Sequence, residues 1–427
     1  MIFYRLLFPL VFLFFLPGLI IKLIRRPGRK KNYAERFAIF SRERRDALQK
    51  MEGAVWFHAV SVGETNVALS MLKKWIEKDP SQKFVFSTTT TTAQEIAWNK
   101  VPENVEVFFC PIDCTPFVRK ALRMIKPSAL VIFETELWPN LLHESAKAGI
   151  KLFLANGRIL DHSAKSYQRF RCFFAPLLRQ FNVICAQTDL DKERFLAIDP
   201  NLNVQVTGNI KFDQVPPADL VPMDLNQYFG DNFIAVLACS THAPEEKMIL
   251  NAFMTAQKKA PSMKLVIVPR HAERGSEIEN TLADAGISYY RKTSGKTLQN
   301  KVECLLADTT GELMKFIKAA DIVLMGKTFC GNNEGQNVIE PSMLGKAIVT
   351  GPEMRNFKQA FNALTEENGV RSIADDSLLP ETIASLALDP QLRSELGQNA
   401  LKAVSAHAGA LNCTIQIMQE KIRTTEN

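Results

Sequence analysis

Short apolar runs alternate with longer helical patterns along most of this 427-residue chain. Segments such as 66–77 and 117–125 space their apolar residues by three or four, as the buried face of a helix does. The apolar runs before the middle of the chain are rich in Val, Ile and Phe and cover residues 54–59, 83–87, 105–109, 129–133, 151–155, 183–186 and 203–206. This alternation predicts βαβ units and a parallel sheet, because parallel strands are joined by crossovers that are usually helices.

A proline-rich segment, DQVPPADLVPMD, interrupts the alternation and predicts a linker over 213–225. A second series of apolar runs follows, at 233–238, 264–268, 287–290, 302–306, 322–325 and 347–350, and a helical stretch then extends from 378 to about 423. Because the chain is too long for one ordinary core, we expect two tandem doubly wound, Rossmann-like α/β domains, over 51–212 and 226–427. This arrangement resembles the GT-B fold of many sugar-nucleotide enzymes, in which the active site lies in the cleft between the domains.

The N-terminus joins an apolar run to a dense cluster of basic residues. Residues 2–24 (IFYRLLFPLVFLFFLPGLIIKLI) are mostly apolar and no small-residue cleavage site follows, which predicts a retained membrane anchor over 1–24. Ten Lys or Arg and two Glu residues lie between positions 22 and 45, a net charge of +8, whereas the whole chain carries +7. The segment 25–50 is therefore expected to contact anionic lipid and to keep the following domains in the cytoplasm. Since the remainder is nearly neutral, the charge does not indicate nucleic-acid binding.

The eight cysteines include no CxxC pair, and Cys110 and Cys114 have no partner pair at zinc-site spacing. His242 and His271 also lack a second ligand at such a spacing, so we expect no catalytic metal. No GxxxxGK[ST] loop is present and no GxGxxG follows a strand, which disfavours P-loop NTPases and Rossmann dehydrogenases.

Glu64 lies where an apolar run passes into a helical pattern, in the string AVWFHAVSVGETN at residues 54–66. Ligands of open α/β sheets bind outside the carboxyl ends of the strands. Ser61 can cap the helix, and Gly63 allows a ligand close to the backbone. A first-turn carboxylate also suits the helix dipole. The residues alone leave two interpretations open for Glu64, a capping acid or a general base.

Other polar side chains follow further strands of the first series. Glu134 and Glu136 flank a threonine at a strand end, where two acids are expected to have a cationic or hydrogen-bonding partner. Helix capping is the alternative for both. Lys211 lies in a glycine-led turn just before the linker, either projecting into the cleft or exposed as an ordinary surface lysine.

The second series carries candidate phosphate and nucleoside contacts. Arg270 follows a strand and precedes a helical pattern, a position suited to a bidentate phosphate contact, with a solvated arginine as the alternative. The tripeptide 311–313 opens a helix and offers free N–H groups to an anion. Asn337 and Glu340 are three apart on one predicted turn, so they could hold a ribose or base edge, or cap the helix.

Several strings of this sequence resemble one family, the 3-deoxy-D-manno-octulosonic acid (Kdo) transferases that glycosylate lipid A in Gram-negative envelopes. The resemblance covers essentially the whole chain. Its strings are FHAVSVGET, ETELWPN, ANGRI, TGNIKFD, STHAPEE, PRHAER, DTTGELM, QNVIEP and the pair formed by Gly351-Pro352 with Asn356-Phe357.

The resemblance implies an inverting GT-B enzyme that moves Kdo from CMP-Kdo to the lipid A precursor (lipid IVA), needs no metal or other cofactor, and works at the cytoplasmic side of the inner membrane. Glu64 corresponds to the family's general base, and Glu134 and Lys211 to positions that stabilise the transition state. The family's CMP-binding segments correspond to Pro269, Arg270, Gly311, Glu312, Leu313, Asn337, Val338, Ile339 and Glu340. The basic segment suits an anionic, phosphorylated acceptor in the inner leaflet.

Two positions depart from the family's strings. Gln336 stands where the family has the histidine of GGHN, and Pro244 replaces the glycine of STHxGEE. Both departures concern donor contacts. The alternatives are another GT-B enzyme, such as a UDP-sugar transferase or an epimerase, and an inactive membrane-tethered scaffold. No motif indicates the number of Kdo residues transferred or the oligomeric state.

Overall fold

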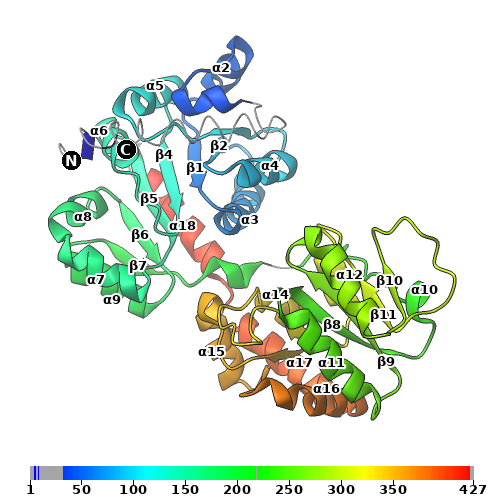
Figure 1. The fold of residues 1–427 in the computed structure, drawn as a ribbon. Coiled ribbons are helices and arrows are strands. Elements are labelled where there is room, and N and C mark those ends of the chain that lie inside the picture. Colours follow the sequence, from blue (N-terminus) through cyan, green and yellow to red (C-terminus); the bar gives the residue numbers. More distant parts are fainter. Residues whose placement is uncertain (1–3, 6–7, 9–31, 215, 218, 424–427) are drawn as a thin grey trace. The chain divides into compact units, whose positions relative to one another are not determined.

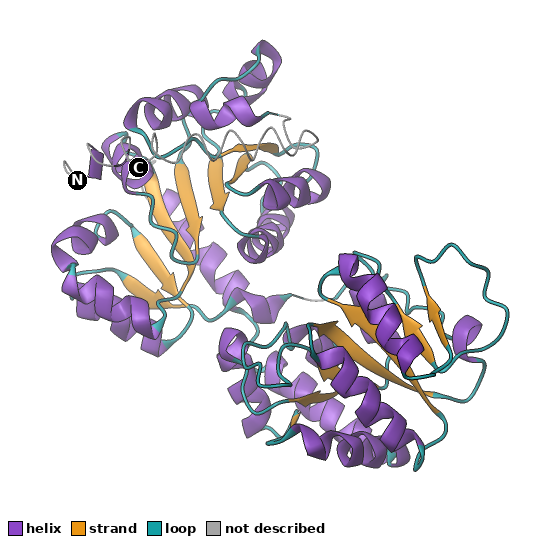
Figure 2. Cartoon of the chain, viewed as in Figure 1, coloured by secondary structure: helices purple, strands orange, loops and turns teal. Residues whose placement is uncertain are grey.

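The computed structural model describes residues 4, 5, 8, 32–214, 216, 217 and 219–423 of the chain. They form two compact units: unit 1 comprises Met1–Asp213 with Ala408–Asn427, and unit 2 comprises Gln214–His407. Each unit contains one seven-stranded parallel sheet with helices on both faces (Figure 1). Figure 2 separates these layers by colour, with orange strands between purple helices. The expectation of two doubly wound α/β domains is confirmed.

The sheet of unit 1 has the strand order β3-β2-β1-β4-β5-β6-β7. Its strands are β1 (Val55–Ala59), β2 (Phe84–Thr88), β3 (Glu106–Phe109), β4 (Ala129–Phe133), β5 (Lys151–Gly157), β6 (Val183–Ala186) and β7 (Val204–Val206). The order reverses between β1 and β4, which pair in parallel from Val55 against Ala129. In sheets of this kind the crevice outside such a reversal is the usual ligand site.

Alternate strand residues of unit 1 point into two apolar layers. Trp56 packs into one layer, whereas its neighbours Val55 and Phe57 pack into the other. Both faces are buried because helices cover them, as all-parallel sheets require. The helices are η2 (Tyr33–Phe37), α2 (Arg42–Gln49), α3 (Val62–Lys78), α4 (Thr91–Lys100), α5 (Thr115–Ile125), α6 (Pro139–Lys147), α7 (Asp161–Arg169), α8 (Arg171–Leu178), α9 (Asp189–Ile198), η3 (Ile210–Asp213) and α18 (Ala410–Arg423).

The last helix belongs to unit 1, which corrects the expected C-terminal domain of 226–427. Helix α18 contacts α3, β5 and η3, and Ala410, Leu411, Ile415 and Met418 lie in the second apolar layer of unit 1. The Asp213 carboxylate accepts the backbone N–H groups of Gly409 at 2.5 Å and of Leu411 at 2.8 Å. The apolar stripe of this helix predicted burial but carried no information about which sheet it covers.

The basic segment expected at 25–50 is described from residue 32 on, and that part packs on unit 1. Arg44 pairs with Glu35 and Glu106, and buried Glu35 accepts the Phe109 N–H at 3.0 Å. The Arg36 guanidinium lies 4.3 Å from the Phe109 ring centroid and donates to the Thr89 carbonyl. These cations are bound within the domain, and η2 and α2 form part of it.

Unit 2 has the strand order β10-β11-β9-β8-β12-β13-β14, which reverses between β8 and β12. Its strands are β8 (Ile234–Thr241), β9 (Met263–Pro269), β10 (Tyr289–Arg291), β11 (Cys304–Leu306), β12 (Ile322–Met325), β13 (Ala347–Thr350) and β14 (Arg371–Ser372). The second series of apolar runs anticipated six of these strands. The sequence analysis missed β14 because its two residues are both exposed and carry no apolar signal.

The helices of unit 2 are α10 (Asn226–Phe229), α11 (Glu245–Gln257), η4 (Ala272–Arg274), α12 (Gly275–Asp284), α13 (Leu313–Ala319), α14 (Ile339–Met343), η5 (Arg355–Phe357), α15 (Lys358–Glu366), η6 (Asp376–Leu378), α16 (Leu379–Leu388) and α17 (Pro390–Ser405). The helical stretch expected from 378 is thus three helices. Pro390 begins α17 after a break at Asp389, and Gly409, with φ of +110°, precedes α18.

Most of the expected membrane anchor, 1–24, lies outside the described residues. Among the residues that are described, no helix is both long enough and apolar enough to cross a membrane.

Candidate active site

Glu64 occupies the first turn of α3, directly after β1 and beside the strand-order reversal of unit 1. Ser61 is the N-cap residue of α3, and its hydroxyl accepts the Glu64 N–H at 3.3 Å. The Glu64 carboxylate in turn accepts the Val60 N–H at 2.8 Å and the Ser61 hydroxyl at 2.6 Å. Capping is therefore observed, and it fixes the carboxylate at the end of β1.

Burial controls the protonation of Glu64. The residue is 5 % exposed, and burial raises the pKa of its carboxyl group above the ordinary value. The hydrogen bonds from Ser61 and Val60 lower this pKa, whereas the nearby charge of Glu134 raises it further. A carboxylate with a raised pKa and fixed hydrogen-bond donors is a suitable proton acceptor.

Glu134 and Lys211, predicted from separate parts of the sequence, lie together. The Lys211 ammonium donates to the Glu134 carboxylate at 2.9 Å. The expectation that the acids after β4 have a cationic partner is thereby confirmed for Glu134. Glu134 has a left-handed backbone, φ +55°, and its N–H donates to the Ala155 carbonyl of β5 at 2.9 Å.

Asn156 at the end of β5 positions the turn that carries Lys211. Its side-chain oxygen accepts the Ile210 N–H at 3.0 Å, and Asn156 is fully buried. Its own carbonyl accepts the Gln187 side-chain amide at 3.0 Å. The string ANGRI drew attention to this asparagine, but the sequence assigned it no role.

Glu136 is a third carboxylate in the same site, and the sequence analysis did not place it among the site residues. Burial raises its pKa to about 7, and the charges of Glu64 and Glu134 contribute to that rise. The half-buried Glu136 therefore titrates near neutrality. Its position after β4 was visible in the sequence, but its pKa depends on neighbours from other elements.

In unit 2, one buried carboxylate organises the loops beside the β8–β12 reversal. Glu245 begins α11, is fully buried, and accepts the backbone N–H of His242 at 2.9 Å. It also accepts the N–H groups of Lys327 at 2.8 Å and of Thr328 and Phe329 at 3.0 Å. Glu245 thus ties the ends of β8 and β12 together.

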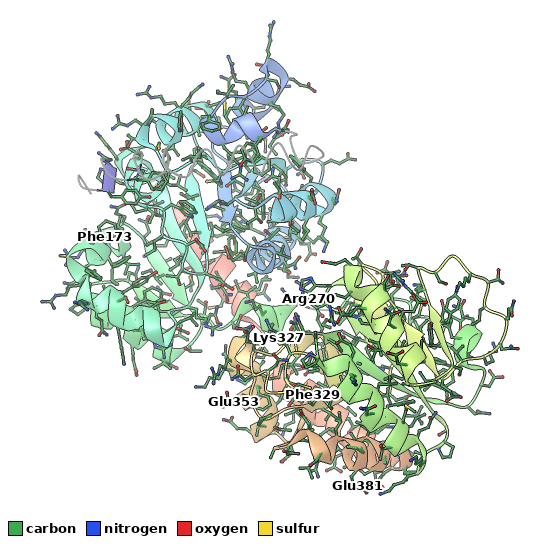
Figure 3. The ribbon with its side chains drawn as sticks, viewed as in Figure 1. Phe173, Arg270, Lys327, Phe329, Glu353 and Glu381 are labelled. Atoms are coloured by element: carbon green, nitrogen blue, oxygen red, sulfur yellow. The ribbon has the colours of Figure 1, made fainter. Side chains whose placement is uncertain are left out.

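These loops carry two cations, Arg270 and Lys327, and Lys327 forms an ion pair with Glu334. Burial lowers the pKa of His242, and the nearby charges of Lys327, His271 and Arg270 lower it further. Arg270 is exposed, and its backbone N–H donates to the Thr241 carbonyl at 3.0 Å. Figure 3 shows Arg270 and Lys327 at the same end of unit 2. Pro269, the last residue of β9, places Arg270 there, and the group suits an anion such as a phosphate.

The other predicted donor residues have structural partners of their own. Gly311 has φ of +84°, and Glu312 precedes α13, where it accepts a hydrogen bond from Lys292 at 2.5 Å. Leu313 is the first residue of that seven-residue helix. The hydrogen bonds from Lys292 and Thr309 hold the pKa of Glu312 below its ordinary value.

The segment 337–340 forms the start of α14. Asn337 accepts the Ile339 N–H at 3.1 Å, so the capping interpretation is observed for this asparagine. Val338 and Ile339 are buried, and Glu340 lies in the first turn. Burial raises the pKa of the Cys239 thiol, and the nearby charge of Glu340 raises it further.

The two departures from the family's strings lie in the loop after β8 and in a loop that contacts it. Gln336 contacts His242, and its amide nitrogen lies 3.0 Å from His242 Nε2. Pro244 immediately precedes α11.

The sequence analysis did not identify Glu245 and Lys327 as site residues. The acid of STHAPEE was visible, but its contact with residues 327–329 joins elements more than 80 residues apart. In the part of the chain that the structure describes, no three His, Cys, Asp or Glu side chains are grouped to hold a metal ion.

Comparisons with known proteins agree with this arrangement. A family model described as 3-deoxy-D-manno-octulosonic-acid transferase (kdotransferase) matches residues 31–214. A 3-deoxy-D-manno-octulosonic acid transferase of Haemophilus influenzae is 25% identical over 400 residues, covering 93% of this chain and 92% of that protein. The enzyme of the same name from Rickettsia felis is 29% identical over 371 residues, covering 85% and 78%.

A solved structure shares the fold. UDP-GlcNAc 2-epimerase from Neisseria meningitidis, bound to UDP-GlcNAc, superposes with a TM-score of 0.57 over 87% of this chain and 100% of that chain, at 12% identity. This likeness concerns the fold alone, and with the two parallel sheets it supports GT-B.

Proposed function

We propose that this chain, which is similar to 3-deoxy-D-manno-octulosonic acid (Kdo) transferases over most of its length, is a member of that family and moves Kdo from CMP-Kdo to a hydroxyl group of the lipid A precursor. The observation that carries the proposal is the placement of Glu64. It is a buried carboxylate held by Ser61 and Val60 at the β1 end, beside the Glu134–Lys211 pair after β4. This group provides a base and a fixed cation at the site where a sheet of this order binds ligands.

The proposed chemistry is a single displacement with inversion. The acceptor oxygen attacks the anomeric carbon of Kdo as its proton passes to Glu64. The bond from that carbon to the phosphate oxygen of CMP breaks, and CMP leaves with the electron pair. Lys211 stabilises negative charge on the donor, and Glu134 fixes the lysine in place at 2.9 Å.

Unit 2 is proposed to hold the CMP moiety. Arg270 and Lys327 neutralise its phosphate, and the N–H groups that begin α13 at 311–313 contribute. Asn337 and Glu340 of the α14 segment contact the nucleoside. The exposed guanidinium of Arg270 is available for this role.

We further propose that transfer requires no metal, because fixed cationic side chains can neutralise the leaving phosphate. Treating the purified protein with EDTA should then leave the rate of Kdo transfer within about twofold of the untreated rate. A loss that Mg²⁺ or Mn²⁺ restores would contradict this part of the proposal.

The reaction itself is tested by incubating the full-length protein with CMP-Kdo and a tetra-acylated lipid A precursor, followed by mass spectrometry of the lipid. The expected product is the precursor carrying one or more Kdo residues, and the mass gives their number. UDP-N-acetylglucosamine in place of CMP-Kdo should give no product. An unmodified lipid with CMP-Kdo would contradict the proposed function.

The place of the protein in the cell is also a proposal. The apolar run at 1–24 and the basic residues between positions 22 and 31 support attachment to the cytoplasmic face of the inner membrane. Fractionation of cells expressing the full chain should recover it with the inner membrane, whereas recovery in the soluble fraction would contradict this proposal.

A further inference from the structure

A cavity of about 230 Å³ in unit 1 is lined by two of the site's carboxylates, Glu134 and Glu136. Its walls come from the loop after β4, the loop after β5 and helix α7, and are formed by Glu134, Thr135, Glu136, Arg158, Ile159, Leu160, Ser163 and Tyr167. The cavity is smaller than the roughly 300–1,000 Å³ of sites that enclose a drug-sized ligand. It therefore suits one part of a larger substrate, such as a single sugar ring.

Contacts with neighbouring residues fix the positions of the residues that line this pocket. The Ile159 N–H donates to the buried Asp191 carboxylate at 3.0 Å, and the Ile159 carbonyl accepts from Arg194 at 2.7 Å. The Thr135 hydroxyl donates to the Arg158 carbonyl, which joins the two loops. The Tyr167 ring stacks on Phe174 with centroids 4.2 Å apart. Such support pre-organises a binding site before the ligand arrives.

The polar groups inside the pocket are left available by these contacts. Within the described part of the chain, the side chains of Arg158, Glu136, Ser163 and Tyr167 make no hydrogen bond or ion pair. Arg158 is half-buried, and no ion pair joins it to Glu134, which is bound to Lys211 instead. The pocket thus offers a guanidinium, two hydroxyls and a carboxyl group to a ligand.

We propose that this pocket is the acceptor subsite: it binds the sugar residue that receives Kdo, with Arg158 contacting an anionic group of the acceptor and Glu136 and Tyr167 contacting sugar hydroxyls. The inference rests on the proposed function and specifies its acceptor site. A bidentate guanidinium contact selects a phosphate or carboxylate, and hydroxyl-bearing rings suit the remaining groups. Glu134 and Glu136 follow β4, which pairs in parallel with β1, and Glu64 lies in the first turn of the helix after β1, so the pocket and the proposed base lie at the same edge of the sheet.

The test is calorimetric titration of the full chain with the deacylated, phosphorylated glucosamine disaccharide of the lipid A precursor. Arg158→Ala should weaken binding about tenfold or more, because it removes a charge-assisted contact. Arg158→Lys should give an intermediate loss, since lysine keeps the charge without the fork. Arg123→Ala, which removes an equally charged but exposed side chain of α5, should change the affinity by less than about twofold.

A second set of titrations shows whether the anionic group that Arg158 contacts belongs to the acceptor or to the donor. The same disaccharide without phosphate should bind equally to the wild type and to Arg158→Ala, and both should bind CMP-Kdo alike. If Arg158→Ala instead weakens CMP-Kdo binding and spares the disaccharide, the anion belongs to the donor and the proposal is wrong. Absence of disaccharide binding to the wild type, or equal affinity in Arg158→Ala, would also overturn it. Because the assay needs no turnover, its outcome is independent of whether Kdo transfer is observed.

Discussion

Glu64 shows how one side chain can have two roles that the sequence alone could not separate. Its carboxylate satisfies the Val60 N–H and the Ser61 hydroxyl, which makes it a capping group. The same contacts fix its position at the end of β1 and favour its ionised form against the effect of burial. Capping and proton acceptance are therefore compatible, and the cap orients the proposed base.

Glu136 leads to a prediction about pH. Its pKa of about 7 means that it is largely protonated below neutrality and gains a negative charge as pH rises. The groups that face it are Glu64, Glu134 with its partner Lys211, and Arg158 and Tyr167 across the pocket. We expect the affinity for the phosphorylated disaccharide to fall as pH rises through about 7, because the new charge repels the anion.

Glu136→Gln should remove this fall, since glutamine stays neutral. The measurement is the dissociation constant from about pH 6 to about pH 8, for the wild type and the variant. The disaccharide without phosphate is the control and should show a weaker pH dependence. An equal fall in the wild type and in Glu136→Gln would show that another group titrates.

Sequence reasoning reached the residues at strand ends but not the residues that complete the pocket. The Glu134–Lys211 pair was anticipated because an acid at a buried strand end needs a partner. Tyr167 was missed because it lies within a helix, where an aromatic residue usually indicates packing. Arg158 was noted only as part of a strand-end string, and its role depends on the fold of α7.

At the scale of elements, Glu245 is expected to be essential to the donor half. Four backbone N–H groups from two loops share its two carboxylate oxygens, and an amide at this position would keep only one of those acceptors. Glu245→Gln should destabilise unit 2 by about 3 kcal/mol, because an amide cannot accept all four bonds. It should also weaken CMP binding, since Lys327 and His242 lose their fixed positions.

Thermal unfolding and calorimetric titration with CMP measure these effects. Glu395→Gln, an exposed acid of α17, is the matched control and should behave as the wild type does. Wild-type stability and CMP affinity in Glu245→Gln would contradict the role of this carboxylate.

Helix α18 gives the second element-scale prediction. Ile415 is fully buried in the second apolar layer of unit 1. Ile415→Ala should cost about 3 kcal/mol, the usual range for such a truncation. Hydrogen exchange should then rise in β1 and β5, whereas β8 and β9 of unit 2 keep their protection.

The exposed neighbour Gln416→Ala is the control for this experiment. Faster exchange in unit 2 instead of unit 1 would contradict the assignment of α18. The sequence placed this helix in the C-terminal domain because periodicity reports that a face is buried and not what buries it. Strands of both sheets were predicted well, because buried parallel strands are continuous apolar runs with sharp ends.

At the scale of the whole molecule, two sheets with the same kind of strand-order reversal each place polar loops outside that reversal. In unit 1 those loops carry acids and a lysine, as the proposed acceptor chemistry requires, and in unit 2 they carry the cations that we propose to contact a phosphate. This division of charge was foreseeable from strand-end residues. The identity of the sugar was not, and it came from the family's strings.

The central claim is that Glu64 is the base for transfer to the acceptor. Glu64→Gln keeps a group that can accept the Val60 N–H, so the fold and CMP-Kdo binding should be retained. The most direct measurement is the single-turnover rate of Kdo transfer from CMP-Kdo to the lipid A precursor, read by mass spectrometry. We predict a fall of about 10²- to 10⁴-fold in the variant with CMP-Kdo affinity within about twofold of the wild type. Transfer at the wild-type rate by Glu64→Gln would contradict the account.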